Sequence, residues 1–340
     1  MKKKSEDSAQ EAFIQRIKSV LPSNISLVDE LTDLLKISSD SAYRRIRGES
    51  SLSIEEITLL CKHFKISFDS FINNSSEHSV SFSYQPFNGN PNSFVLYLQS
   101  IKAGLEAILR YPIDQQQIIF AAEDIPVFHH FAHPNLTTFK LFYWNKSILN
   151  APGFEGKKFE LIATDPLLKE LAKDIYELYA KIPSIEIWSD DTVNSTFKQI
   201  EFYWDSGVFL SKADALLICE ELNQMLLRIC KQAELNAKLD IHNKPVNTEN
   251  SYLLYHSDVM IGNNCVLTQM GDMKETYISY HTFNSMATKN ATYCNETELW
   301  LKNLIRKSNL ISGVGEKQRY RYFKIIDDVL KKLIAKIENG

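Results

Sequence analysis

Two short helical patterns joined by a tight turn constrain the fold of this chain more than any other feature. Apolar residues recur three and four positions apart over residues 26–35, which is the spacing of one face of an α-helix. Ser38 or Ser39 then provides an N-cap for a second helix over residues 40–47, and Gly48 suits a left-handed C-terminal cap. Two helices joined in this way predict a helix-turn-helix.

Further helical patterns surround this pair. Amphipathic spacing predicts a helix over residues 11–21, a capping box at Ser53 starts a fourth helix, and residues 68–72 add a short fifth. Five short helices make a bundle of a size that folds alone, so we predict an all-α helix-turn-helix domain over residues 9–74. Residues 75–92 are rich in Asn, Ser, Gly and Pro and form the predicted linker.

Residues 93–340 mix helical patterns with apolar, strand-like runs, which predicts a larger mixed α/β (α+β) domain that ends in helices. The predicted helices lie near residues 93–110, 136–148 and 167–182, from residue 195, and over residues 211–235, 296–307 and 316–338. The predicted strands lie at residues 117–121, 185–188, 251–261, 265–270 and 276–283. We expect the last three strands to pair antiparallel, with turns at residues 262–264 and 271–272.

The second helix of the pair carries the candidate contacts to DNA. Ala42 and Ile46, four residues apart, would pack on the first helix and leave the opposite side free. Arg44 can bind O6 and N7 of guanine with both arms of its guanidinium, whereas Ser39 and Ser41 can reach bases or phosphates. The remaining candidates are Asp40 and Tyr43 at the leading edge and, for contacts to phosphates, Lys36, Arg45 and Arg47.

The run Ser-Ser-Asp-Ser-Ala-Tyr-Arg-Arg-Ile-Arg-Gly over residues 38–48, with residues 27–31 and 52–56, resembles the BetR-type helix-turn-helix of bacterial regulators. That family is related to phage repressor folds, and the resemblance covers about a fifth of the chain. It implies DNA binding through the second helix of the pair. Two positions depart from the broader repressor pattern: Thr32 stands where Ala is usual, and Lys36 where Gly eases the turn.

Composition and charge narrow the class of protein. A net charge of −4 excludes a protein that coats nucleic acid through bulk electrostatics, but it does not exclude a local basic surface. The five cysteines are scattered and never spaced as C-x-x-C, which is typical of reduced thiols in a cytoplasm. Polar residues 5–8 stand where a signal peptide needs an apolar core, and no run approaches the ~18 apolar residues of a membrane span. We therefore expect a cytoplasmic protein with no membrane partner.

Catalytic motifs are missing after residue 90, where there is no nucleophile elbow, no dinucleotide fingerprint and no paired metal ligands. His129 and His133 are four residues apart, but Pro134 follows and no H-E-x-x-H is formed. The loop over residues 312–317 lacks the spacing of a P-loop, although a helix-hairpin-helix could place its N–H groups on a DNA phosphate. We expect no enzymatic activity, no cofactor and no metal.

The last helix has apolar residues spaced 3, 4, 3, 4, a seam that either pairs two subunits or docks on its own domain. Its members are Phe323, Ile326, Leu330, Leu333 and Ile337. The expected partners are double-stranded DNA, a second copy of the chain in a homodimer, and an unidentified small-molecule or protein effector. A transcriptional regulator is the first hypothesis. A helix-turn-helix fused to a catalytic effector and a non-enzymatic interaction module stay open.

Overall fold

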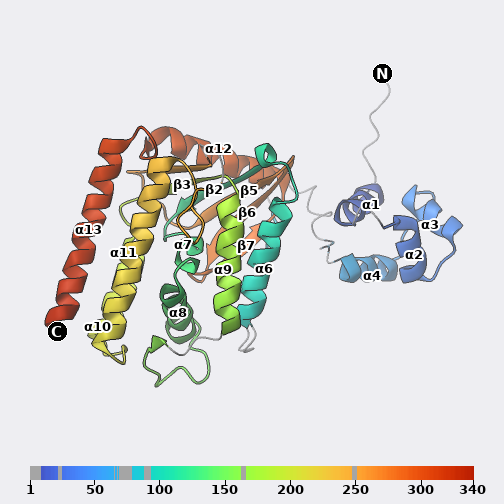
Figure 1. Cartoon of the computed structure of the whole chain (residues 1–340). Coiled ribbons are helices and arrows are strands. Elements are labelled where there is room, and N and C mark those ends of the chain that lie inside the picture. The colour runs from blue at the N-terminus through green and yellow to red at the C-terminus, as the bar shows by residue number, and fades with distance from the viewer. Residues whose placement is uncertain are drawn as a thin grey trace. The chain divides into compact units, whose positions relative to one another are not determined.

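The computed structural model describes residues 9–21, 25–64, 66, 68, 79–87, 93–161, 166–246 and 251–340. The chain separates into two units, Met1–Ser81 and Phe82–Gly340, and each has a hydrophobic core of its own (Figure 1). The described part of the first unit is helical, and the second combines helices with a mixed sheet. The predicted succession of a helical region and a mixed α/β region is therefore confirmed.

The helices of the first unit begin where the sequence provides caps. The hydroxyl of Ser38, rather than that of Ser39, caps the second helix of the pair by accepting a hydrogen bond from the N–H of Ser41 at 3.3 Å. Four predicted helices are confirmed, as α1 (Ala9–Val20), α2 (Leu27–Leu35), α3 (Ser39–Ile46) and α4 (Ile54–Phe64). The fifth, over residues 68–72, lies almost wholly outside the described residues. The core residues are Phe13, Ile14, Ile17, Leu31, Ala42, Leu52, Leu60 and Ile66.

An eight-stranded sheet with the order β1-β7-β6-β5-β2-β3-β4-β8 runs through the second unit. Strands β2, β3 and β4 are parallel neighbours, and β5, β6 and β7 continue beside β2 as an antiparallel meander. Strand β2 is apolar and buried along nearly its whole length, as expected of a strand covered on both faces. The strands are β1 (Ser83–Tyr84), β2 (Gln116–Ala122), β3 (Ser184–Trp188), β4 (Tyr252–His256), β5 (Cys265–Met270), β6 (Met273–Tyr280), β7 (Asn284–Thr288) and β8 (Asn309–Leu310).

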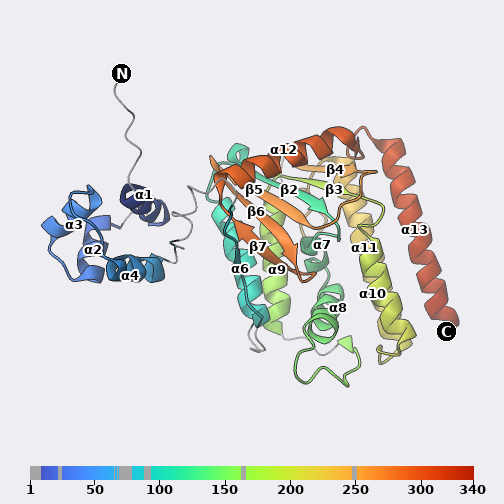
Figure 2. The ribbon, with the colours of Figure 1, turned by 180° about the vertical axis from the view of Figure 1, so that it is seen from behind.

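Helices cover both faces of this sheet. Helices α6, α9 and α11 lie on one face (Figure 1), and α12 crosses the opposite face (Figure 2). The helices are α6 (Ser93–Ile108), α7 (Val127–Phe131), α8 (Pro134–Tyr143), α9 (Pro166–Lys181), α10 (Asn194–Asp205), α11 (Lys212–Leu235), α12 (Ala291–Lys307) and α13 (Glu316–Asn339), with a 3-10 helix η2 (Ile113–Gln115) and a π-helix η3 (Trp144–Ile148).

The predicted seam of the last helix packs on its own unit. Helix α13 lies along α11, and Ile326, Leu330, Leu333 and Ile337 are buried in the largest core cluster. Of the two alternatives for this seam, docking on its own domain is therefore confirmed. These apolar side chains are not available to a second subunit.

The predicted antiparallel pairing of residues 251–261 with residues 265–270 is wrong. Strand β4 is shorter than predicted and pairs parallel with β3, so β2 and β3 separate it from β5. Parallel neighbours such as β3 and β4 must be joined by a long crossover connection. The glycine and asparagines of residues 262–264 favour a tight turn and carry no signal of that connection. The second predicted turn is confirmed, since Met270 pairs with Met273 and Gly271 has a φ of 60°. Strand β7 was not predicted.

Part of the predicted linker belongs to the second unit. Ser83 and Tyr84 form β1 and pair with Ala287 and Met286 of β7. Of residues 75–92, only 79–87 are described, so the rest of the predicted linker lies outside the described residues.

Candidate functional site

The α2–α3 pair has the arrangement that a helix-turn-helix requires. Leu31 of α2 and Ala42 of α3 are fully buried in the same core, and the two helices pack on each other. Ile46, one turn after Ala42, is half-buried and extends this contact. The inner side of α3 is therefore fixed by packing, and its outer side faces solvent.

The turn between the two helices has an unusual backbone. Lys36, at the C-cap of α2, lies in the left-handed region with φ 54° and ψ 44°. Its N–H and that of Ile37 both donate to the carbonyl of Thr32, the latter at 3.3 Å. A side chain with a Cβ is disfavoured in this conformation, which glycine adopts freely. The sequence-based expectation that Lys36 stands at a position suited to glycine is thus matched by its backbone.

The predicted contact residues divide by exposure. Tyr43 is 49% exposed and Arg44 is also exposed, so the middle of α3 presents an aromatic ring and a guanidinium to solvent. Arg47 is exposed and lies 3.3 Å from a carboxylate oxygen of Glu49. The other exposed candidates are Lys36, Ser39 and Asp40, and the half-buried ones are Ser41 and Arg45.

Arg45 differs from its neighbours because α4 holds it. Its Nε and Nη2 atoms donate to the two carboxylate oxygens of Glu56 at 3.2 and 2.8 Å. Glu56 also accepts a hydrogen bond from the N–H of Ser53 at 2.9 Å, and the Ser53 hydroxyl accepts one from the N–H of Glu56, which confirms the predicted capping box. Partial burial raises the pKa of Glu56, but the hydrogen bonds from Arg45 and Ser53 outweigh it and leave the pKa lowered. The phosphate contact of Arg45 stays a prediction.

Gln10 of α1 supports the far end of α3 and was not singled out from the sequence. Its side-chain amide donates to the carbonyls of Arg45 at 2.9 Å and Ser50 at 2.8 Å, and accepts from the N–H of Leu52 at 3.0 Å. These contacts span more than thirty residues along the chain, so no local spacing could have revealed them.

The second unit contains a cavity of about 380 Å³ between α6, α7, the last turn of α8 and strands β5–β7. Most of its wall is aromatic or aliphatic, and Ser83 and Tyr84 of β1 form part of it. Because Ser83 and Tyr84 are also exposed to solvent, the cavity reaches the surface beside β1. The apolar wall includes Tyr97, Ile101, Leu105, Ile118, Phe120, Phe128, Trp144, Val266, Tyr277 and Phe283.

Four side chains with a carboxylate, ammonium or imidazole group line this cavity from buried or half-buried positions: Asp124, His130, Lys140 and Glu275. The Lys140 ammonium donates to Thr196 Oγ1 at 3.0 Å and Gln199 Oε1 at 2.8 Å, and the side chain is 4% exposed. Burial lowers the pKa of Lys140, and the nearby charge of Asp124 opposes this shift. Burial, together with the charge of Lys140, holds the pKa of His130 well below its usual value. Lys140 was not singled out from the sequence. The signal that could have revealed it is a lysine within the apolar run of residues 136–143.

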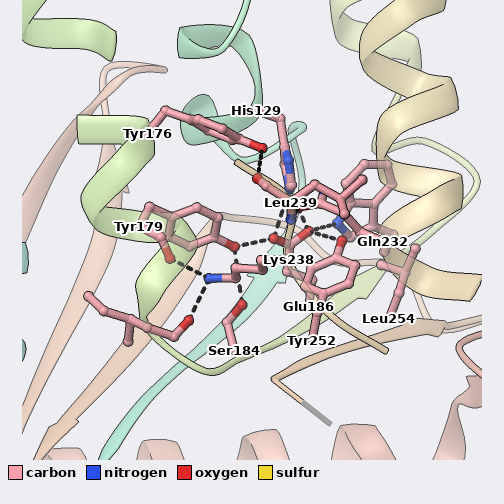
Figure 3. A network of polar contacts seen from close by, with 12 residues as sticks. His129, Tyr176, Tyr179, Ser184, Glu186, Gln232, Lys238, Leu239, Tyr252 and Leu254 are labelled. Atoms are coloured by element: carbon pink, nitrogen blue, oxygen red, sulfur yellow. Dashed lines mark hydrogen bonds and ion pairs between the residues drawn. The ribbon is translucent and has the colours of Figure 1, made fainter. Parts of the chain in front are cut away.

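A second polar cluster surrounds Glu186 of β3, which is fully buried (Figure 3). His129 Nε2 lies 2.9 and 3.1 Å from its two oxygens, and the Tyr179 hydroxyl donates to Oε1. Trp188 Nε1 and the Tyr252 hydroxyl donate to Oε2 at 2.9 and 3.0 Å. Burial alone raises the pKa of Glu186, but the charge and hydrogen bond of His129, the hydrogen bond from Tyr179 and the charge of Lys238 leave it lowered. The carboxylate is thus a saturated anion inside the core.

Lys238 balances this buried charge from the segment between α11 and β4. Its ammonium donates to the carbonyls of Tyr179 and Ile182 at 2.8 and 2.7 Å, and lies 3.2 Å from the centroid of the Tyr179 ring. Neither Glu186 nor Lys238 lines the cavity. The cluster joins α7, α9, β3 and β4 and serves the packing of the fold.

The histidines and the glycine-rich loop have structural roles. His129 binds Glu186, His130 Nε2 lies 3.3 Å from Thr196 Oγ1, and within the described ranges no cluster of His, Cys, Asp and Glu could hold a metal ion. The N–H groups of Ile311 and Gly313 donate to the carbonyls of Leu254 and Ala233, both at 2.9 Å. Both N–H groups are bonded inside the unit and are therefore not available to a DNA phosphate, and the helix-hairpin-helix alternative stays a prediction.

Across the described part of the chain, no helix combines the length and apolarity of a membrane span. Comparison with known proteins finds no family model, no curated protein and no solved structure that matches the chain. The resemblance to BetR-type regulators therefore stays a prediction.

Proposed function

We propose that this chain is a cytoplasmic transcriptional regulator that binds double-stranded DNA sequence-specifically through α3, as a homodimer. Its first unit reads the operator, with Arg44 on a guanine, and Lys36 and Arg47 on phosphates. The second unit senses a small molecule or a partner, or supplies the contact between subunits.

The observation that carries the proposal is the division of α3 into two sides. Ala42 is fully buried against α2, whereas Tyr43, Arg44 and Arg47 are exposed. A helix held by its partner on one side and presenting arginines on the other suits insertion into the major groove. The bonds of Arg45 and Gln10 to neighbouring elements keep α3 rigid, which favours base recognition over a loosely held basic surface.

The second unit supports sensing more than catalysis. Its cavity is mainly apolar with a few buried polar groups, the composition of a small-molecule site. The carboxylate of Glu186, which has more hydrogen-bond partners than the acids of the cavity, is saturated by hydrogen bonds and closed to solvent. A catalytic effector needs such groups in contact with a substrate.

Selection of bound sequences from a random duplex pool with the full-length protein tests the proposal. We expect one enriched motif made of two inverted half-sites about 10 bp or a multiple of that apart, because each subunit of a dimer places one recognition helix. A motif without inverted symmetry would contradict the dimer. Equal recovery of all sequences would contradict sequence-specific binding.

A further inference from the structure

We infer that the cavity of the second unit binds a small molecule with an aromatic or aliphatic body and an uncharged polar head that both donates and accepts hydrogen bonds. This inference deepens the sensing role proposed above. Its test contains no DNA, so its failure would leave the DNA-binding proposal intact.

The size and wall of the cavity define the body of the ligand. A cavity of about 380 Å³ falls within the range of small-molecule sites and exceeds the ~150 Å³ that holds benzene in an apolar cavity. Trp144 and Phe283 stack with ring centroids 4.8 Å apart on one wall, and Tyr97 meets Phe283 edge-on. A flat body of about two fused rings suits such a wall.

Lys140 and Asp124 define the head group. An ammonium has three N–H donors, and the described residues account for two of those of Lys140. Asp124 Oδ1 is buried and has no hydrogen-bond partner among the described residues. The two side chains form no ion pair with each other within 4.0 Å, although both line the cavity. A head that accepts from Lys140 and donates to Asp124 satisfies both, and it adds no net charge beside this oppositely charged pair. The other carboxylate of the lining, Glu275, already lies 3.5 Å from the ammonium of Lys289.

Gly104 keeps the space open. It lies in the interior of α6 and lines the cavity, and a Cβ placed there would meet only the Tyr277 hydroxyl, at 3.9 Å. Glycine weakens a helix at such a position, and alanine would fit. The chain thus retains a destabilising residue where a larger one would fill the cavity.

The turn between β6 and β7 also points to a ligand site. His281 and Thr282 both have positive φ values, 49° and 71°, and Thr282 lines the cavity. Branching at Cβ makes this conformation unfavourable for threonine. Backbone strain of this kind is concentrated at ligand clamps and active sites.

Three naphthalenes that differ only in the head group provide the test: 2-naphthamide, 2-naphthoate and 2-naphthylmethylamine. Calorimetric titration of the full-length protein at pH 7.5 should give an amide Kd at least about tenfold lower than that of either charged compound, because a net charge must be desolvated beside a like charge. The Asp124→Asn variant leaves Lys140 unbalanced, so its preference should shift toward naphthoate by at least about tenfold.

Variants of Gly104 show whether the compounds occupy this cavity. Gly104→Leu should abolish binding of the amide without lowering the melting temperature, because leucine is the better helix former and its side chain extends into open space. Gly104→Ala is the matched control and should retain binding within about threefold, since it adds one methyl group. No binding of the amide to the wild type, a preference of the wild type for naphthoate, or unchanged binding by Gly104→Leu would each overturn the inference.

Discussion

Arg45 of α3 and Glu56 of α4 form a two-bond ion pair, Nε to Oε2 at 3.2 Å and Nη2 to Oε1 at 2.8 Å, that fixes α3 to the helix after it. Both side chains are 18% exposed, so water screens the pair only in part. Because Glu56 also closes the capping box of α4, one carboxylate secures two helices.

The Glu56→Gln variant should therefore destabilise α3 and α4 by about 1 kcal/mol, since it removes the charge and keeps the shape. Hydrogen exchange of the backbone amides in the full-length protein measures this change. Glu49→Gln is the matched control: its partner Arg47 lies in an exposed pair, and the loss should stay below about 0.5 kcal/mol. The folded pKa of Glu56 is below its ordinary value of 4.5, so its contribution is present above that pH and is lost as the pH falls further. A difference between wild type and variant that persisted at pH 2 would contradict this account.

Replacing Lys36 by glycine should stabilise the first unit. The left-handed backbone costs a residue with a Cβ about 1–2 kcal/mol, and the greater flexibility of glycine when unfolded offsets part of the gain, so the net effect is about 0.5–1 kcal/mol. Lys36→Ala loses the same charge but keeps the Cβ, which makes it the control for both stability and DNA affinity. Amide exchange in α2 and α3 compares the two variants, and a glycine variant no more stable than the alanine variant would refute the expectation.

Arg44→Ala and Arg47→Ala should weaken operator binding in different ways. Loss of Arg44 should cost about 1–3 kcal/mol and relax the preference at one base pair, because its two-armed contact reads guanine. Loss of Arg47 should weaken binding to all sequences alike. It should also reduce the slope of log K against log salt concentration by about one. Fluorescence titrations against operator and scrambled duplexes at several salt concentrations separate the two effects. Equal affinity of wild type and Arg44→Ala for every duplex would remove the role assigned to Arg44.

The second unit should lose stability as the pH falls below 6.5. Burial and the nearby charge of Arg228 lower the pKa of His133 from 6.5 to about 3, so the unfolded chain takes up a proton that the folded chain excludes. Each such histidine reduces the free energy of unfolding by up to about 1.4 kcal/mol per pH unit over this interval. Urea denaturation between pH 7 and 4 measures the slope. His133→Asn keeps a favourable residue at the N-cap of α8. This variant should reduce the slope of the unfolding free energy against pH by up to about 1.4 kcal/mol per pH unit below pH 6.5, the contribution of one proton, and leave the slope unchanged above pH 7. An unaltered slope below pH 6.5 would count against a neutral, buried His133.

Local patterns in the sequence predicted the helices of the first unit, because a cap such as Ser38 and the periodic apolar residues of α2 act within a few positions of the chain. The pairing of β4 with β3 could not be predicted. Only a short turn between two strands indicates in the sequence which strands pair, and parallel strands are not joined by such a turn. Strand β7 reads Asn-Ser-Met-Ala-Thr, with a single β-branched residue, and gave no periodic signal.

The residues of the cavity illustrate the same limit. Ser83, Lys140 and Phe283 line one cavity although some two hundred positions separate the first from the last. Of these three, only Lys140 has a local signal in the sequence, a charge within an apolar helix, although it was not singled out from the sequence. The contact residues of α3, by contrast, lie within twelve positions, so the sequence could propose them together.

Strand β1 joins the first residues of the second unit to β7. Two residue pairs join it to β7, and it follows almost directly after Ser81, the last residue of the first unit. At about 0.2–1 kcal/mol for each cross-strand pair, so short a strand contributes about 0.4–2 kcal/mol, which overlaps the 1–3 kcal/mol of a typical coupling between two binding sites. Reciprocity then applies: if a molecule in the cavity changes the affinity for an operator by some factor, the operator changes the affinity of the cavity by that same factor.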